Sequence, residues 1–215
     1  MNVALLIHDK VEHYNVISNT IIETGDNVLI FENKVTFSEL ISCEIDLILI
    51  YGYRHLLNKQ FRDKFKNKII NLHPSYLPFG RGCYPNFWSF VDDTPKGVSL
   101  HFINEGIDTG DILFQRKHTF DKELTLKETY YNLQTSMLSL FSMNYSNIRE
   151  YRFSPIKQNY DEGTFYFKKD FDLVFGMFEK GFNTKIKDII SKRDLIKKQL
   201  NRNYEYTSHF PKSNT

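Results

Sequence analysis

The sequence predicts an α/β domain whose sheet is parallel in its first part and mixed in its second, with helices on its faces. In the first half of the 215-residue chain, short apolar runs alternate with longer amphipathic stretches, which is the pattern of strand–helix–strand units. Residues 45–51 (IDLILIY) are rich in Ile and Leu, as expected for a strand buried on both faces of a parallel sheet.

The alternation of apolar runs and amphipathic stretches predicts the bounds of each strand and helix in the first half. Val16, Ile17, Ile21 and Ile22 are spaced to form one apolar face of the first helix. The expected strands are residues 3–7, 27–31, 45–51 and 68–73, and the expected helices are residues 11–24 and 61–68.

The second half begins with a segment, residues 74–85, in which Pro and Gly are too dense for a regular element. Strands are expected at 97–103 and 112–119, on either side of a turn-rich stretch. A helix is expected at 125–139, because five residues recur at spacings of 4, 3, 4 and 3 and draw one core-facing stripe. These residues are Leu126, Tyr130, Leu133, Met137 and Leu140.

Composition excludes several classes of protein. The net charge of +2 lacks the basic excess of a nucleic-acid-binding protein. Cys43 and Cys83 are too few for a disulfide framework, so we expect a reducing, cytoplasmic setting. The N-terminal apolar run lacks the basic region and cleavage site of a signal peptide, and no stretch is long enough for a membrane helix. We therefore expect a soluble protein with no nucleic-acid or membrane partner.

Two phosphate-binding fingerprints are missing. The first strand runs into Ile7-His8-Asp9-Lys10-Val11, without the glycine-rich turn that lets a backbone approach a pyrophosphate. NAD-dependent chemistry is therefore not expected. The chain also lacks a Walker-type loop, which argues against a kinase or ATPase.

A polar cluster is expected where strands end. Asn71, His73 and Ser75 occupy alternate positions and point the same way in an extended chain, and Pro74 favours that conformation at His73. Asp108 lies between glycines in the turn GIDTGD. Open α/β sheets bind ligands beyond the carboxyl ends of their strands, so these side chains are candidates for one site.

These residue types suit acyl transfer to an amine. Asn71 could donate to the oxyanion, a contact worth roughly 10²–10³ in rate, and the His73–Asp108 pair could take the amine proton, worth about 10²–10⁴. The alternatives stay open at this point. A single His beside Pro at a strand end, like His73, is more often a hydrogen-bonded structural residue, and an Asp in a Gly-rich turn, like Asp108, commonly forms an Asx-turn. Metal ligation by His73, His101 and Asp108 lacks tight ligand spacing.

Three ordered motifs resemble the signature of the folate-dependent formyltransferases: NLHPSYLP (71–78), GVSLH (97–101) and GIDTGDI (106–112). The resemblance covers about Leu47 to Leu133. It implies that family's Rossmann-like fold, with Asn71, His73 and Asp108 as the catalytic residues. His101 matches a second histidine, for which a supporting role and plain packing are both open. No metal is expected.

The resemblance also implies 10-formyltetrahydrofolate as co-substrate. Two segments, 50–54 and 104–108, resemble those that line the pterin pocket on either side. The expected folate contacts are Tyr51, Gly52, Tyr53, Glu105, Ile107 and Asp108.

Two further segments, RGCYPNFW (81–88) and Gln158 to Asp170, resemble the members that act on nucleotide-linked amino sugars. Two departures are Gly80, where that subgroup often has Asn, and Tyr166, where it often has His. The expected reaction is formylation of the amine of a dTDP-linked amino-deoxy sugar, in lipopolysaccharide or O-antigen synthesis, by a homodimer. The expected substrate contacts are Arg81, Asn86, Trp88 and Tyr166.

We expect the catalytic domain over 1–150. Residues 151–215 form a C-terminal extension that completes the substrate site or a dimer contact and ends in a disordered polar tail from about Asn201. One alternative is a methionyl-tRNA formyltransferase-like enzyme, although the residues after Phe153 are too few for the tRNA-binding barrel of that enzyme. The purine-pathway member of the family fits less well, because its motif around the catalytic Asp usually has a different sequence after the second Gly. Another alternative is a non-catalytic folate- or nucleotide-binding module. The presence of Asn71, His73 and Asp108 argues against it, because a binding protein does not need all three.

Overall fold

The computed structural model describes residues 1–8 and 12–204. Its centre is a six-stranded sheet in the order β2-β1-β3-β4-β6-β7. The first four strands pair in parallel, and β6 and β7 join antiparallel, which confirms the predicted parallel-then-mixed sheet. The strands are β1 (Asn2–Ile7), β2 (Asn27–Phe31), β3 (Leu47–Tyr51), β4 (Ile69–His73), β6 (Lys96–Phe102) and β7 (Ile112–His118).

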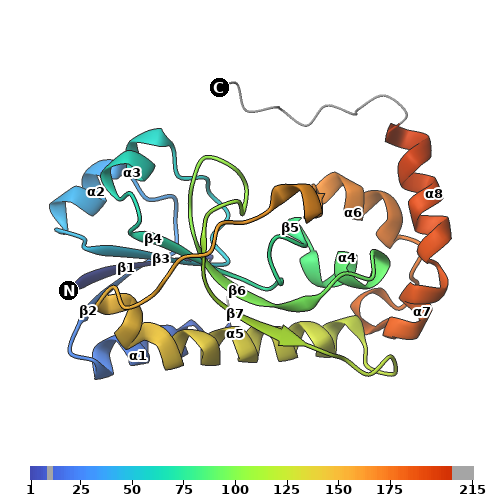
Figure 1. Ribbon diagram of the computed structural model, residues 1–215, viewed down its shortest axis with the longest axis horizontal. Coiled ribbons are helices and arrows are strands. Elements are labelled where there is room, and N and C mark those ends of the chain that lie inside the picture. The colour runs from blue at the N-terminus through green and yellow to red at the C-terminus, as the bar shows by residue number, and fades with distance from the viewer. Residues whose placement is uncertain (9–11, 205–215) are drawn as a thin grey trace.

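Helices cover both faces of this sheet (Figure 1). One face packs against α1 (Tyr14–Glu23) and the long α5 (Leu126–Arg149), and the other against α2 (Phe37–Ser42) and α3 (Lys59–Lys64). Alternate residues of each parallel strand enter the two cores. Because Ile70 and Leu72 face α5, Asn71 and His73 lie on the opposite side of β4.

The first helix is shorter than predicted, and fewer of its apolar residues are buried. Its first residue, Val11, lies outside the described residues, and α1 begins at Tyr14. Ile17 and Ile21 are buried, whereas Val16 is 37% and Ile22 57% exposed. The helix lies near the end of the sheet and packs mainly on α5 and β2, so only a narrow stripe of it is covered.

Three other elements differ from the sequence prediction. The expected helix at 61–68 is α3, which begins and ends earlier. A capping box between Thr36 and Glu39 begins the unpredicted α2. The stretch expected to be irregular contains β5 (Arg81–Gly82) and leads into α4 (Pro85–Val91), since a proline fits the first position of a helix.

Helix α5 is longer than predicted and begins with a capping box between Thr125 and Glu128. Four members of its predicted stripe are buried, but Tyr130 is 49% exposed. The prediction of a core position for Tyr130 is wrong, because this side of α5 borders a cavity rather than the sheet.

The C-terminal segment (residues 151–204) runs along the sheet from the end of α5, and its helices pack at one end of the sheet (Figure 1). Its strand β8 pairs with β5 in a separate two-stranded sheet, and its helices share a hydrophobic core with α4. Helix α8 continues past Asn201, the expected start of the tail, and residues 205–215 lie outside the described part. The elements are η1 (Tyr160–Glu162), β8 (Phe165–Tyr166), α6 (Lys168–Phe175), η2 (Gly181–Asn183), α7 (Ile186–Ser191) and α8 (Arg193–Tyr204).

We predict that Trp88→Ala destabilises the fold. Trp88 is 0% exposed and stacks on Tyr166 with ring centroids 3.9 Å apart. Removing a fully buried aromatic ring typically lowers the free energy of unfolding by about 3–5 kcal/mol, measurable by urea denaturation. Tyr131→Ala is the control, because Tyr131 is 57% exposed. Equal losses in the two variants would contradict the packing role of Trp88.

Candidate active site

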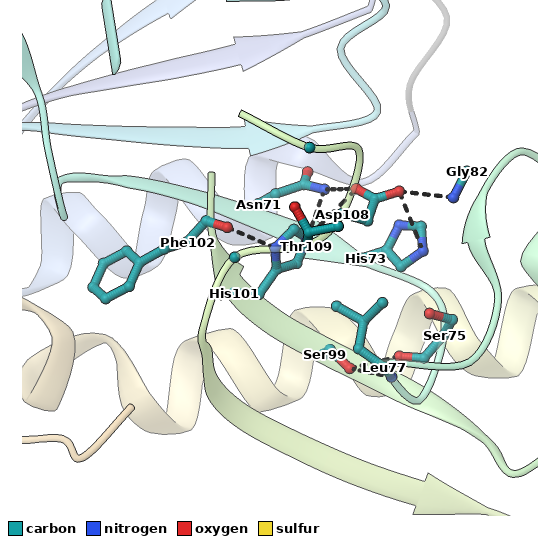
Figure 2. Close-up of polar contacts among 12 residues, drawn as sticks. Asn71, His73, Ser75, Leu77, Gly82, Ser99, His101, Phe102, Asp108 and Thr109 are labelled. Carbon is teal, nitrogen blue, oxygen red and sulfur yellow. Dashed lines mark hydrogen bonds and ion pairs between the residues drawn. The ribbon is translucent and has the colours of Figure 1, made fainter. Parts of the chain in front are cut away.

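The side chains of Asn71, His73, His101 and Asp108 meet at the carboxyl-terminal half of β4 (Figure 2). Asn71 and His73 lie on β4, His101 lies on the neighbouring β6 in register with Asn71, and Asp108 lies on the β6–β7 loop. The structure thus brings together the three residues that the sequence predicted as one site.

Hydrogen bonds fix the orientation of the Asn71 amide. Its Nδ2 donates to Asp108 Oδ1 at 3.3 Å and to His101 Nε2 at 3.1 Å. A carboxylate oxygen only accepts, so the amide atom that faces Asp108 is the nitrogen. Both amide hydrogens are therefore engaged, and the longer of the two bonds is the one to Asp108.

His101 is fully buried and holds one tautomer. Its Nδ1 lies 2.8 Å from the Phe102 carbonyl oxygen, which only accepts, so Nδ1 carries the proton and Nε2 accepts from Asn71. Burial, opposed by the charge of Asp108, lowers the pKa of His101 to about 4. His101 is therefore neutral at pH 7 and serves to hold the Asn71 amide.

His73 is also held through one ring nitrogen. Its Nε2 lies 2.9 Å from the Gly80 carbonyl oxygen and 3.8 Å from Asp108 Oδ2. The carbonyl requires a hydrogen on Nε2, so in neutral His73 the Nδ1 atom keeps its lone pair. A proton gained at Nδ1 gives an imidazolium whose charge lies beside the Asp108 carboxylate, an arrangement that stabilises the protonated base.

Asp108 is an ionised carboxylate with little solvent contact. Burial by itself raises its pKa, but the two neighbouring histidines, the Gly82 N–H and Arg81 together hold the pKa below its ordinary value. The Gly82 N–H donates to Oδ2 at 2.9 Å. The carboxylate is thus available at neutral pH as a charge partner for His73.

A cavity of about 630 Å³ opens onto this cluster. Of the folate contacts predicted from resemblance, Tyr51, Gly52, Tyr53 and Asp108 line it. Glu105 and Ile107 are exposed on the same loop as Asp108 and are not part of the described lining, so the structure does not bring them to the cavity.

None of the four predicted substrate residues is part of the described lining of this cavity. Asn86 is 5% exposed and donates to the Leu126 carbonyl and to Thr129. Trp88 and Tyr166 stack on each other, and Tyr166 donates to Asp92. These three side chains pack the C-terminal segment onto α4, and their assignment as substrate contacts stays a prediction.

Arg81 lies closer to the cluster than the other three. Its guanidinium carbon is 5.5 Å from the centre of the Tyr160 ring, and its Nε is buried without a hydrogen-bond partner. Burial lowers the pKa of Arg81, while Tyr160 and Asp108 oppose that shift. Arg81 therefore lies outside the described cavity lining, and its positive charge helps to keep Asp108 ionised.

The cavity has a second wall that the sequence analysis missed. It is formed by α5 and the start of α1, and exposed aromatic and charged side chains line it. Tyr130 was assigned to the core by its spacing, and isolated polar positions on a helix give no signal of a cavity. The lining residues on this wall are Glu12, His13, Lys127, Tyr130, Tyr131, Gln134 and Met137.

A smaller cavity of about 420 Å³ adjoins this wall. Lys127 and Tyr131 line both cavities, and Asn183 of η2 lines the smaller one. The two spaces thus share a border made of one cationic and one aromatic side chain.

The model of the formyl transferase family matches residues 12–142. The chain belongs to this family. It is 32% identical over 165 residues, 73% of its length, to the methionyl-tRNA formyltransferase of Finegoldia magna, and spans 53% of that relative. It is 29% identical over 136 residues to the phosphoribosylglycinamide formyltransferase of Haemophilus influenzae, covering 59% of this chain and 64% of that one. The chain thus spans about half the length of the first relative.

A solved structure covers more of the chain. The formyltransferase PseJ from Anoxybacillus kamchatkensis, in complex with UDP-4,6-dideoxy-4-formamido-L-AltNAc and tetrahydrofolate, superposes with a TM-score of 0.82 at 32% identity. The match covers 90% of this chain and 100% of that one. The methionyl-tRNA formyltransferase of Clostridium thermocellum, at 23% identity and a TM-score of 0.61, shares the fold.

Two features are absent from the described residues. None of their helices is long and apolar enough to cross a membrane. Over residues 1–8 and 12–204, no group of three or more His, Cys, Asp or Glu side chains is arranged to hold a metal ion.

We predict that stability falls between pH 6.5 and pH 4. In that window the unfolded chain protonates His101, whereas the folded chain, whose His101 pKa is about 4, does not. The lost free energy of unfolding is on the order of 3 kcal/mol. The lowered pKa of Asp108 adds a loss only below its unfolded value of 3.8. Urea denaturation at several pH values measures this, and His101→Gln should flatten the slope. An unchanged slope in that variant would contradict the burial of a neutral imidazole.

Proposed function

We propose that the chain is a sugar N-formyltransferase. It transfers the formyl group of 10-formyltetrahydrofolate to the amine of a nucleotide-linked amino-deoxy sugar. The observation that carries the proposal is the similarity to PseJ, which extends over that chain's entire length.

The same observation supports a choice of nucleotide carrier for the sugar. The sequence analysis favoured dTDP, but PseJ was solved with a UDP-linked 4-formamido sugar. The formyltransferase from Helicobacter canadensis that was solved with dTDP-3-aminofucose is 20% identical to this chain, which supports a common fold and no more. We therefore take a UDP-linked 4-amino-4,6-dideoxy sugar as the first candidate substrate.

Catalysis begins with attack of the unprotonated sugar amine on the formyl carbon. A bond forms between the amine nitrogen and this carbon, and the carbonyl oxygen becomes an oxyanion. The attacking nitrogen then loses a proton to Nδ1 of His73, and Asp108 stabilises the imidazolium. The bond from the carbon to N10 of the folate breaks, N10 takes up the proton, and tetrahydrofolate leaves.

Asn71 stabilises the oxyanion. Its 3.1 Å bond to His101 fixes the plane of the amide, and its 3.3 Å bond to Asp108 is the one exchanged for the substrate oxygen. A preorganised donor of this kind lowers the barrier because it needs no reorganisation when charge develops.

The two substrates approach from different walls of the cavity. Folate lies against the β3 end, along Tyr51 to Tyr53, and the sugar amine reaches the cluster from the α5 side. The nucleotide then extends past Lys127 and Tyr131 toward the smaller cavity, where the ammonium meets the diphosphate and the phenol ring offers a stacking surface for the base. Homodimer formation, a cytoplasmic location and a role in lipopolysaccharide or O-antigen synthesis stay predictions.

We predict formyl transfer from 10-formyltetrahydrofolate to a UDP-linked 4-amino-4,6-dideoxy sugar in a panel that also contains dTDP-linked 3- and 4-amino sugars. Mass spectrometry detects the added formyl group. Charged initiator tRNA is the comparison substrate. Formylation of that tRNA instead would support the methionyl-tRNA alternative, and folate binding without transfer to any acceptor would support the non-catalytic module.

We predict that Lys127→Met raises the KM for the nucleotide sugar about tenfold, the equivalent of roughly 1.4 kcal/mol of lost binding. The KM for 10-formyltetrahydrofolate should stay unchanged, because Lys127 lies on the α5 wall. Lys122→Met is the matched control, since Lys122 is exposed just before α5 and is not part of the described lining of either cavity. An equal rise in both variants, or a rise for folate alone, would contradict the proposed direction of the nucleotide.

A further inference from the structure

The loop that carries Asp108 has a backbone that needs outside support. Asp108 has φ 52°, in the left-handed region that aspartate enters more readily than most residues with a Cβ but that still costs more than it does for glycine. Two residues later, a Cβ at Gly110 would overlap the Phe102 carbonyl, so the loop lies tightly against the end of β6. Such a conformation persists only where the surrounding structure enforces it.

The enforcing contacts come from the C-terminal segment. Gln158 Nε2 donates to the carbonyl oxygens of Asp108 at 2.9 Å and Gly110 at 2.6 Å. The Tyr160 hydroxyl donates to the carbonyl oxygen between them, that of Thr109, at 2.6 Å. Consecutive carbonyls of the catalytic loop are thus held by two side chains that lie far along the chain from it.

The same segment also positions the donor to the Asp108 carboxylate. In the β5–β8 pair, the N–H groups of Arg81 and Cys83 donate to the carbonyls of Thr164 and Tyr166. Because successive N–H groups of a strand point to opposite edges, Gly82 directs its N–H away from β8. That N–H meets Asp108 Oδ2 at 2.9 Å.

Packing alone does not account for Gln158. The residue is 7% exposed, and its Oε1 is buried without a hydrogen-bond partner. Burying an unsatisfied oxygen costs free energy, which a leucine of similar volume would avoid. The amide is explained by its two hydrogen bonds to the loop rather than by the space it fills.

We propose that Gln158, assisted by Tyr160, is a positioning residue for catalysis. Gln158 holds the Asp108 loop in its left-handed conformation, so that the carboxylate stays beside His73 and Asn71. The C-terminal segment is on this account part of the catalytic apparatus, although it supplies no group that touches the reacting atoms. The effect on turnover rests on the proposed formyl transfer, whereas the effect on the loop does not.

The test compares Gln158→Leu with Gln199→Leu. Gln199 also donates from Nε2 to a backbone carbonyl, that of Leu173 at 3.0 Å, but on α8. We expect Gln158→Leu to lower kcat with the UDP-linked amino sugar between about tenfold and a hundredfold, since small misplacements of catalytic groups have effects of this size. Its KM values should stay within about twofold, and Gln199→Leu should keep the kcat of the parent.

A double-mutant cycle separates positioning from general destabilisation. In an Asp108→Asn background the carboxylate is already lost, so adding Gln158→Leu should lower kcat by less than about twofold further. Residues that act as a unit show such non-additivity. A full additional loss in the double variant would mean that Gln158 acts independently of Asp108 and would overturn the proposal.

Amide hydrogen exchange provides a readout that needs no substrate. Exchange across residues 104–111 should speed up in Gln158→Leu, and less in Tyr160→Phe, while Gln199→Leu leaves it unchanged. Tyr160 is 44% exposed, so its loss of one hydroxyl leaves the fold intact even if Gln158→Leu does not fold. Unchanged exchange in both loop variants would overturn the proposal. Absence of sugar formylation by the parent enzyme would instead refute the proposed function, and the exchange measurement would still test the positioning role of Gln158.

Discussion

The charged and largely buried carboxylate of Asp108 is the constraint on which the rest of this structure depends. A carboxylate withdrawn from water stays charged only where donors replace the lost hydration. Here the two histidines, Arg81 and the Gly82 N–H hold the pKa of Asp108 below its ordinary value. His73 and His101 lie on the main sheet, whereas Arg81 and Gly82 form β5 of the small one. Groups from both sheets therefore stabilise the charge, so assembly of the two sheets also prepares the site.

This constraint gives the C-terminal segment its place in the molecule. The segment buries an aromatic core against α4, and that core holds β8 beside β5. Gln158 and Tyr160, just before β8, then reach the loop of Asp108. Residues 158–166 thus connect a hydrophobic core away from the cavity to the position of the carboxylate for which we propose a catalytic role. The full-length match to PseJ is consistent with a unit that includes this segment.

The sequence was sufficient to predict the main sheet and the convergence of Asn71, His73 and Asp108. Both predictions rest on short, regular stretches of sequence, in which strand alternation and the motif resemblance can be recognised. The sequence was not sufficient for the small sheet, since two-residue strands carry no periodic signal and pair over a long separation. The resemblance also did not reveal that Trp88 and Asn86 are buried, since similarity of sequence does not separate a pocket from a core. Tyr130 was assigned to the core but lines the cavity, because helical spacing alone does not tell which neighbour covers a side chain.

The most direct test of the central claim is the titration of the Asp108 side-chain carboxyl by ¹³C NMR, with Asp108→Asn used to assign its resonance. The account predicts an apparent pKa below the ordinary value near 3.9, so that the resonance keeps its ionised position at the lowest pH at which the protein remains folded. A carboxyl that titrates above that ordinary value would show that burial outweighs the donors around it. Asp108 would then not be the charge partner that His73 requires.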